Sequence, residues 1–256
     1  MKKKKAQKRQ VLWKILFRRT LIWGGGGCYA GSATHIGKNA FTLAEVLITL
    51  GIIGIVAAMT LPTLIQKHKE QETVAKVKKF YSVISQAIML ARVEHGDVDT
   101  WDFAGTTTGS NAQSNTNFAN YIKPHLQIIK DCQVTPDKKC VQEGYTSYLN
   151  GTPYTNTDYN ENIYYKMILK DGSLFWLRTN GEGCHNSDAA TDNVCALIWY
   201  DANANRPPYT LGKDVFVFFV FKDAVVPHSN DDCSIDSHGW GCSRYILEHG
   251  DMGYLH

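Results

Sequence analysis

The feature that most constrains this chain is an apolar run of 25 residues, from Phe41 to Ile65, in which Glu45 carries the only charge. A helix rises about 1.5 Å per residue, so this run would span roughly 37 Å, enough to cross the hydrocarbon core of a bilayer. The run therefore predicts a membrane-spanning helix. A carboxylate inside such a helix is costly to insert, so Glu45 is by default a functional residue.

The charges of the chain are divided sharply at this run. Residues 1–40 hold ten of the 27 Lys and Arg residues and no Asp or Glu, which leaves 17 basic and 24 acidic residues in the remainder. A basic segment ahead of a spanning helix stays in the cytoplasm, so everything after Ile65 is expected on the other side of the membrane. Nucleic-acid binding is the rival interpretation of these lysines. It is not the one expected, because the positive charges stop where the apolar run begins.

The residues at the start of the run add a family resemblance. A basic segment, the small residue Ala40, and then Phe41-Thr-Leu-Ala-Glu45 opening an apolar helix resemble the cleavage and methylation signature of type IV prepilins and type II secretion pseudopilins. The resemblance implies that residues 1–40 are a leader, removed by a cut between Ala40 and Phe41, and that the new Phe41 amine is methylated. Glu45 would then be the fifth residue of the mature chain, and Pro62 the twenty-second, where many pilins also have proline. Leaders of this kind usually end in Gly, and Ala40 departs from that pattern. This leader is also long, and either it is extended or its start lies further downstream.

Beyond the spanning segment 41–65, the helix is expected to continue as an amphipathic segment over residues 66–96. No helix breaker stands between Pro62 and Gly96, and apolar residues recur there at steps of three and four. Such a stripe predicts one helix face packed on a globular domain. The stripe comprises Leu64, Val74, Val77, Tyr81, Ile84, Ile88 and Ala91. Pro62 has no N–H and should kink the helix or open it locally. A simple amphipathic linker to an unrelated domain is the alternative.

The remaining residues, 97–256, read as a loop-rich domain with several strands. Residues 97–117 and 145–162 have the composition of loops, and residues 118–129 suggest a short helix interrupted at Pro124. Apolar runs predict strands, of which the first two form a hairpin around Lys170-Asp-Gly172. The predicted strands are 163–169, 173–178, 194–200, 215–221 and a short last one at 244–247. The expected fold is therefore α+β and pilin-like, a long helix packed on a small antiparallel sheet with disulfide-closed loops. The segment from Asp201 to Phe216 adds a looser resemblance to bacterial pilin-like proteins.

Six cysteines of this domain fall into three close pairs: Cys132 and Cys140, Cys184 and Cys195, Cys233 and Cys242. An even number in a translocated, loop-rich domain predicts disulfides. Six cysteines permit fifteen pairings, and the three local pairs are favoured. Zinc is the competing interpretation, but the Cys and His spacings do not follow a usual two-plus-two ligand pattern.

The domain carries one weak candidate for a metal site and no catalytic motif. Asp201-x-Asn203 begins like a calcium-binding loop, yet Arg206 and Gly212 stand where an EF-hand needs Gly and Glu. An Asx-rich turn is the alternative. The sequence has no Gly-x-Ser-x-Gly, His-Glu-x-x-His or phosphate-binding loop, and its histidines read as surface residues. No cofactor and no enzymatic activity are expected.

These observations favour a structural subunit of a type IV pilus or type II secretion pseudopilus. The expected partners are prepilin peptidase, other copies of the chain and related pilins in a helical filament, and an inner-membrane assembly platform. The expected location is the bacterial inner membrane, with a cytoplasmic N-terminus and a periplasmic C-terminal domain, and then the filament. A membrane-anchored binding module, such as an adhesin or a DNA-uptake minor pilin, is the second interpretation. A membrane-tethered hydrolase is the third.

Overall fold

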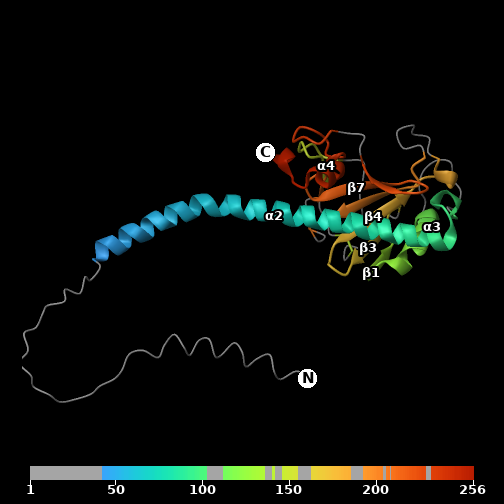
Figure 1. Cartoon of the computed structure of the whole chain (residues 1–256), viewed down its shortest axis with the longest axis horizontal. Helices are drawn as coiled ribbons and strands as arrows, with labels where there is room; N and C mark the ends of the chain where they lie inside the picture. The colour runs from blue at the N-terminus through green and yellow to red at the C-terminus, as the bar shows by residue number, and fades with distance from the viewer. Residues whose placement is uncertain are drawn as a thin grey trace, which may run out of the picture. The chain divides into compact units, whose positions relative to one another are not determined.

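The computed structural model of the chain describes residues 42–102, 112–135, 140–141, 146–154, 163–185, 193–203, 206–207, 209–228 and 232–256. The described residues divide into two units at Ile53, and the second unit is Gly54–His256. In the second unit, a long helix packs on an antiparallel sheet, as Figure 1 shows. This is the α+β arrangement that the sequence predicts.

The long helix α2 runs from Leu43 to His95, which confirms the predicted continuation of the apolar run into an amphipathic half. It continues as one helix through Pro62. The helix ends at Gly96, whose φ of 85° lies in the left-handed region. The Gly96 amide donates to the Arg92 carbonyl at 2.9 Å. Glycine adopts this conformation without the steric cost that a Cβ imposes, so Gly96 is a natural helix terminator.

Only the second half of α2 contributes to the core. Its buried residues are Val74, Val77, Phe80, Ile84, Ala87, Ile88 and Ala91. The predicted stripe was wrong at Leu64, which is 65% exposed, whereas Tyr81 is partly buried and packs against the core, where its ring stacks on Phe218. Leu64 precedes the point at which α2 meets the sheet. Phe80, which the predicted stripe does not include, is buried beside Tyr81.

Six strands form the main sheet, in the order β1-β3-β4-β5-β7-β8, and all neighbours are antiparallel. Their bounds are β1 Ile128–Gln133, β3 Tyr165–Leu169, β4 Leu174–Thr179, β5 Ala196–Asp201, β7 Val215–Val220 and β8 Val225–Pro227. A parallel pair of short strands, β2 Thr146–Ser147 and β6 Tyr209–Thr210, forms a second sheet. The four central strands match the predicted ones to within two residues.

Aromatic residues join α2 to the sheet. Phe175, Tyr200 and Phe216 are cross-strand neighbours on β4, β5 and β7. The Phe80 ring stacks on Tyr200, with ring centroids 4.0 Å apart and an angle of 13° between the planes. Aromatic pairs of this kind contribute about 0.5–1.5 kcal/mol beyond the area that they bury. Phe80 is therefore the main anchor of the helix.

The opposite face of the sheet has its own apolar cluster, in which Trp176, Trp199 and Val217 are adjacent in register. Because both faces are covered, β5 and β7 are buried at every position. This explains why their sequences are unbroken apolar runs rather than alternating ones.

The segment between α2 and the sheet differs from the prediction. We expected loop up to residue 117 and a helix over 118–129, but the helix α3 spans Ala112–Ile122, the 3-10 turn η2 spans Lys123–His125, and the edge strand β1 follows. Pro124 lies in the first turn of η2, where its missing N–H costs nothing. The polar start of α3 is held by buried Asn115, whose side-chain oxygen accepts bonds from the Thr179 amide and hydroxyl at 2.7 and 2.9 Å.

The predicted last strand at residues 244–247 was wrong, because these residues belong to the helix α4, Cys242–His249. Cys242 and Ile246 are four residues apart and both buried, and Arg244 bonds Glu248 on the exposed side at 2.7 Å. These are helical spacings. The remaining short 3-10 turns are η1 Val98–Thr100, η3 Glu182–Cys184 and η5 Gly253–Leu255.

Three disulfides close loops of the domain: Cys132–Cys140, Cys184–Cys195 and Cys233–Cys242. They are the three local pairs that the sequence spacing favours. The first ties β1 to the loop that follows it, the second joins η3 to the start of β5, and the third joins the loop after β8 to the first turn of α4. Each thus fastens irregular backbone to an adjacent regular element.

Candidate functional site

At the N-terminal end of α2, Glu45 makes a set of local hydrogen bonds. The Glu45 carboxylate accepts hydrogen bonds from the Thr42 backbone amide at 2.8 Å and from the Thr42 hydroxyl at 2.9 Å. In return, the Glu45 amide donates to the Thr42 hydroxyl oxygen at 3.2 Å. This reciprocal arrangement is a capping box, in which a Thr before the helix and a Glu three residues later satisfy amides that the helix leaves unpaired. Glu45 therefore caps the N-terminal end of α2. Its carboxylate also belongs to the segment that is predicted to enter the membrane.

Sequence reasoning singled out Glu45 and missed Thr42. The signal was available, because Thr-x-x-Glu ahead of an apolar run is the sequence pattern of a capping box. The proposed cleavage residues Ala40 and Phe41 lie outside the described residues. Pro62 lies within α2, 17 residues beyond Glu45, so the structure does not bring these two predicted residues together.

From Leu43 to Ile65, the surface of α2 is apolar and exposed. The large apolar residues with at least 45% exposure here are Leu43, Val46, Leu47, Ile48, Leu50, Ile52, Ile53, Ile55, Val56, Met59, Leu61, Leu64 and Ile65. Within the described part of the chain, α2 is the one helix that is long and apolar enough to cross a membrane, and its most apolar window has no buried residue. Such a surface requires lipid or another apolar surface to cover it.

The calcium candidate forms a hydrogen-bonded turn at the end of β5. Asp201 is fully buried and accepts a bond from the Asn203 amide at 2.9 Å. The Asn203 side chain accepts from the Arg206 amide at 3.0 Å and donates to the Arg206 carbonyl at 2.7 Å. These are the bonds of an Asx turn. In the described ranges, no group of three or more His, Cys, Asp or Glu side chains is placed to hold a metal ion.

One carboxyl in the same loop has an unusual environment. Burial raises the pKa of Asp214 to about 6, against the opposing effects of Lys213 and of the Thr210 amide. Its carboxyl is thus partly protonated in mildly acidic conditions, whereas an exposed Asp would be ionised.

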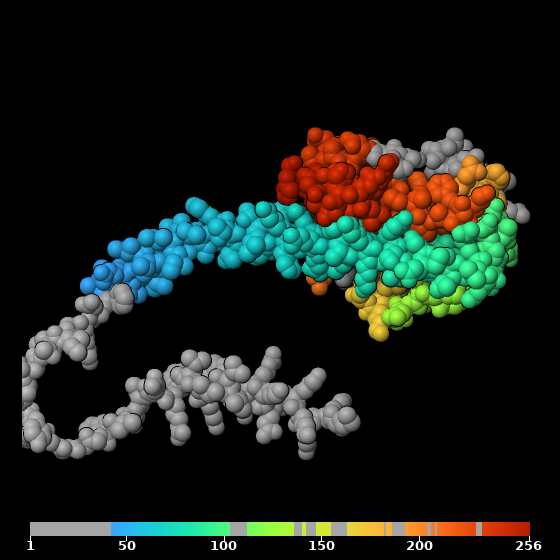
Figure 2. Space-filling model, viewed as in Figure 1, coloured from blue at the N-terminus to red at the C-terminus, as the bar shows by residue number. Residues whose placement is uncertain are grey.

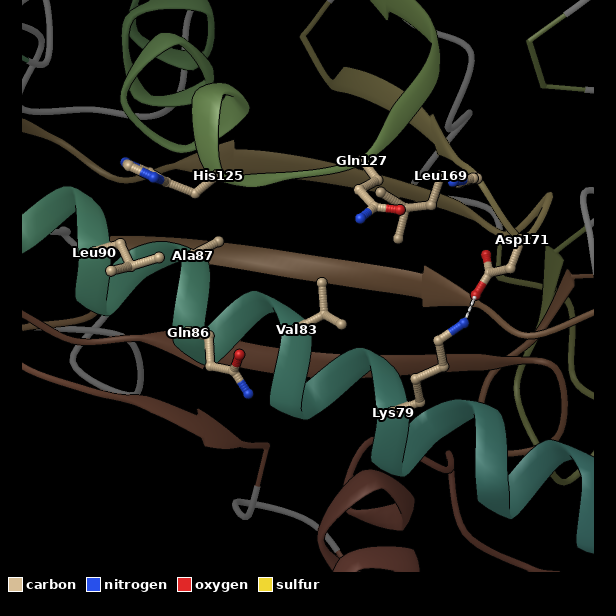
Figure 3. A pocket seen from close by; sticks show the side chains of 10 residues that line it. Lys79, Val83, Gln86, Ala87, Leu90, His125, Gln127, Leu169 and Asp171 are labelled. Atoms are coloured by element: carbon tan, nitrogen blue, oxygen red, sulfur yellow. Dashed lines mark hydrogen bonds and ion pairs between the residues drawn. The ribbon is translucent and has the colours of Figure 1, made fainter.

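Among the described residues, α2 borders a smaller and a larger hollow. The smaller, about 330 Å³, lies between α2, the η2–β1 connection and the β3–β4 hairpin (Figure 3). Val83, Ala87 and Leu90 form its apolar side, and an ion pair between Lys79 and Asp171 at 2.7 Å closes one end. His125 stands at the other end as its single imidazole. The lining has no Ser, Thr or Cys, and its one carboxylate, Asp171, is paired with Lys79 at the end away from His125, so this hollow presents no hydroxyl or thiol nucleophile beside a base.

The larger hollow, which we call the α2 groove, has a volume of about 1030 Å³. One wall is the stretch of α2 from Pro62 to Lys76, and the other comes from the loop between β5 and β7 and from the C-terminal residues. In Figure 2 the C-terminal residues, drawn in red, pack against α2, and His256 contacts Glu70 there at 3.1 Å.

Two family models match the chain, and their matched ranges meet at Pro62. Residues 37–61 match the prokaryotic N-terminal methylation motif, the prepilin-type cleavage and methylation signal. Residues 63–250 match a family of unknown function, DUF6613. No curated protein and no solved structure matches the chain. The motif together with the one long apolar helix fits a membrane-anchored, pilin-like protein. The chain thus carries a prepilin-type signal at its head and, from residue 63 onward, belongs to the DUF6613 family.

Proposed function

We propose that this chain is a structural subunit of a type IV pilus or a type II secretion pseudopilus, assembled through its N-terminal apolar helix. The observation that carries the proposal is the exposed apolar surface of α2, with Glu45 as its single charge, at the position of the methylation motif. A bilayer can cover this surface before assembly, and the helices of neighbouring subunits can cover it afterwards.

In this proposal, processing precedes assembly. The basic leader, residues 1–40, keeps the N-terminus in the cytoplasm, and the domain after α2 is periplasmic. Prepilin peptidase cuts between Ala40 and Phe41, and the new Phe41 amine is methylated. The cut converts an uncharged peptide nitrogen into a positive amine four residues before Glu45.

Glu45 then sets the axial register between neighbouring subunits of the filament. Its carboxylate pairs with the Phe41 amine of a neighbouring subunit, because a charge in an apolar environment is tolerated only when an opposite charge pairs with it. Thr42 orients the carboxylate by holding one of its oxygens. Pro62 leaves one helical carbonyl without its donor, which makes the assembly helix deformable at that point. The partners are other copies of the chain, related pilins and an inner-membrane assembly platform.

Mass spectrometry of the N-terminus of the membrane-associated protein tests this proposal. The expected N-terminal peptide begins with methylated Phe41. An Ala40→Gly variant should be cut at least as completely, because Gly is the usual last residue of such leaders, and the bulky Ala40→Leu should remain uncut. An intact Met1, or a cut at another bond in the unaltered chain, would overturn the proposal.

A further inference from the structure

The α2 groove combines positive charge with exposed apolar side chains. Lys69 on one wall and Arg206 and Lys213 on the other are all exposed. Among the residues that the structure describes, no carboxylate lies within ion-pair distance of these three cations. They are therefore available to an anionic partner.

The carboxylates of the same groove are already engaged. Glu72 pairs with Lys76 at 2.8 Å, and Glu70 contacts the His256 ring at 3.1 Å. Asp214 is partly buried, and burial raises its pKa to about 6. Glu70 and Glu72 thus have partners of their own, and Lys69, Arg206 and Lys213 outnumber the remaining acid of the groove, Asp214.

Exposed apolar residues flank these cations. Ile65 is 53% exposed and Ile235 is 47% exposed, and Pro62 is exposed beside them. A soluble anion would leave such residues in water, whereas the interfacial region of a bilayer accommodates apolar side chains and offers phosphates to cations. Nucleic acid fits less well, because the chain after residue 40 has 24 acidic residues against 17 basic ones.

The position of the groove along the chain identifies the surface that it meets. Pro62 and Ile65 are the last residues of the apolar run that starts at Phe41. A run of that length reaches from one side of the hydrocarbon core to the headgroup region of the other. The residues of α2 that line the groove therefore follow directly on the segment that leaves the bilayer.

We infer that the α2 groove seats the domain on anionic phospholipid headgroups of the membrane that α2 crosses, with Lys69, Arg206 and Lys213 contacting the phosphates. The inference rests on the proposed insertion of residues 41–65. In this inference the domain is docked on the membrane before assembly. Extraction of the subunit into a filament must then break the contacts between the groove and the headgroups. Each cation near an anionic surface contributes about a fivefold factor to such docking.

Lysine acetylation of the full chain in nanodiscs tests this inference. One set of nanodiscs contains phosphatidylcholine alone, and the other contains phosphatidylcholine mixed with phosphatidylglycerol. We expect Lys69 and Lys213 to be acetylated at least about fivefold more slowly in the anionic nanodiscs. High salt should remove the difference, because it screens exposed charges. Lys170 and Lys222, which are exposed and lie outside the groove, are internal controls whose rates should not change.

Variants separate the groove from general attraction to the bilayer. Arg206→Gln should restore most of the acetylation of Lys213 in anionic nanodiscs, and Lys222→Gln, which removes one charge elsewhere, should restore none. Equal rates for Lys213 in the two lipids would overturn the inference. Protection by inorganic phosphate in neutral nanodiscs would overturn it in favour of a soluble anion site. Protection that follows the number of chains per nanodisc, whatever the lipid, would overturn it in favour of self-association.

The same experiment distinguishes this inference from the function on which it rests. Co-elution of the chain with either nanodisc measures insertion. A chain that enters neither nanodisc contradicts the proposed membrane anchoring, and the docking with it. A chain that enters both, but whose Lys69 and Lys213 react equally in both, leaves the proposed function intact and overturns the docking alone.

Discussion

Glu45 combines two roles that one substitution can separate. Gln at this position can still accept the bonds from Thr42, since a capping box tolerates Gln as well as Glu, but it cannot pair with an amine. We therefore expect Glu45→Gln to insert and to be cut between Ala40 and Phe41 as the unaltered chain is. Its incorporation into filaments should fall by at least about tenfold, measured as the ratio of sheared filament to membrane-bound protein.

Thr42→Ala is the matched control for this prediction. It removes the hydroxyl that bonds Glu45 and retains the carboxylate charge. Loss of a cap weakens a helix end by about 0.5–2 kcal/mol, but the backbone amide at position 42 can still donate to the carboxylate, so filament yield should fall much less than with Glu45→Gln. A normal filament yield for Glu45→Gln would refute the pairing role.

At a second residue, Asp214, the raised pKa should make the free energy of unfolding depend on pH. Burial raises its pKa in the folded state from 3.8 to about 6, so folding favours the protonated form. The stabilisation is fully present below the unfolded pKa and is lost as the pH rises through about 6. Asp214→Asn, which stays neutral, should therefore be more stable than the unaltered domain at neutral pH, by up to about 2–3 kcal/mol.

Urea unfolding at several pH values measures this difference. The gap between Asp214→Asn and the unaltered chain should be small in acid and should open between about pH 4 and pH 6. Asp236→Asn, at an exposed position, should change stability by less than about 0.5 kcal/mol. A gap between Asp214→Asn and the unaltered chain that is independent of pH would contradict the effect of burial on Asp214.

At the scale of elements, Phe80 predicts how strongly α2 is held to the sheet. Its side chain is 2% exposed and contacts the rings of Phe175, Tyr200 and Phe218. Phe80→Ala should lower the free energy of unfolding by about 3–5 kcal/mol. Val93→Ala, on the same helix but 81% exposed, should change it by less than about 0.5 kcal/mol. Equal effects of the two substitutions on the urea midpoint would contradict this packing.

The elements that could be predicted from the sequence are those whose pattern is set by burial alone. The apolar runs of β4, β5 and β7, and the Gly172 hairpin between β3 and β4, belong to this group. The edge strand β1 was missed because Ile128–Gln133 is mostly exposed or half-buried, so its residues carry little hydrophobic signal. The start of α3 was missed because its stability comes from bonds between Asn115 and Thr179, 64 residues away.

The candidate site was predictable where a short local pattern marks it. Glu45 stands out as a lone charge, and Thr42 follows from its spacing to Glu45. The α2 groove could not be predicted, because its walls come from α2, from the loop containing Arg206 and Lys213, and from Ile235. Only tertiary contacts, such as the bond from Lys76 to the Ala202 carbonyl at 3.2 Å, bring these segments together.

At the scale of the whole molecule, the chain should separate into an assembling part and a folding part. A chain that begins at Gln66 lacks the exposed apolar residues from Leu43 to Ile65 but keeps Val74 and every later core residue. It should be soluble and monomeric in size-exclusion chromatography with light scattering. A chain that begins at Gln86 also loses Val77, Phe80 and Ile84 and should not fold. Filaments built by the chain from Gln66 would refute the assembly role of residues 41–65.

The helix α2 has no covalent cross-link to the sheet that it supports, since none of the three disulfides includes one of its residues. Tension applied to the subunit along α2 would therefore load the contact between helix and sheet in shear. That contact consists of apolar packing around the Phe80 stack and a few polar bonds, such as those of Lys76 and Lys79. Because α2 is continuously helical between Pro62 and Val74, it contains no flexible linker there that could lengthen under tension. The mechanical strength of a subunit under tension is accordingly that of its aromatic core, and reducing the disulfides would leave this strength largely unchanged until the loops themselves unfold.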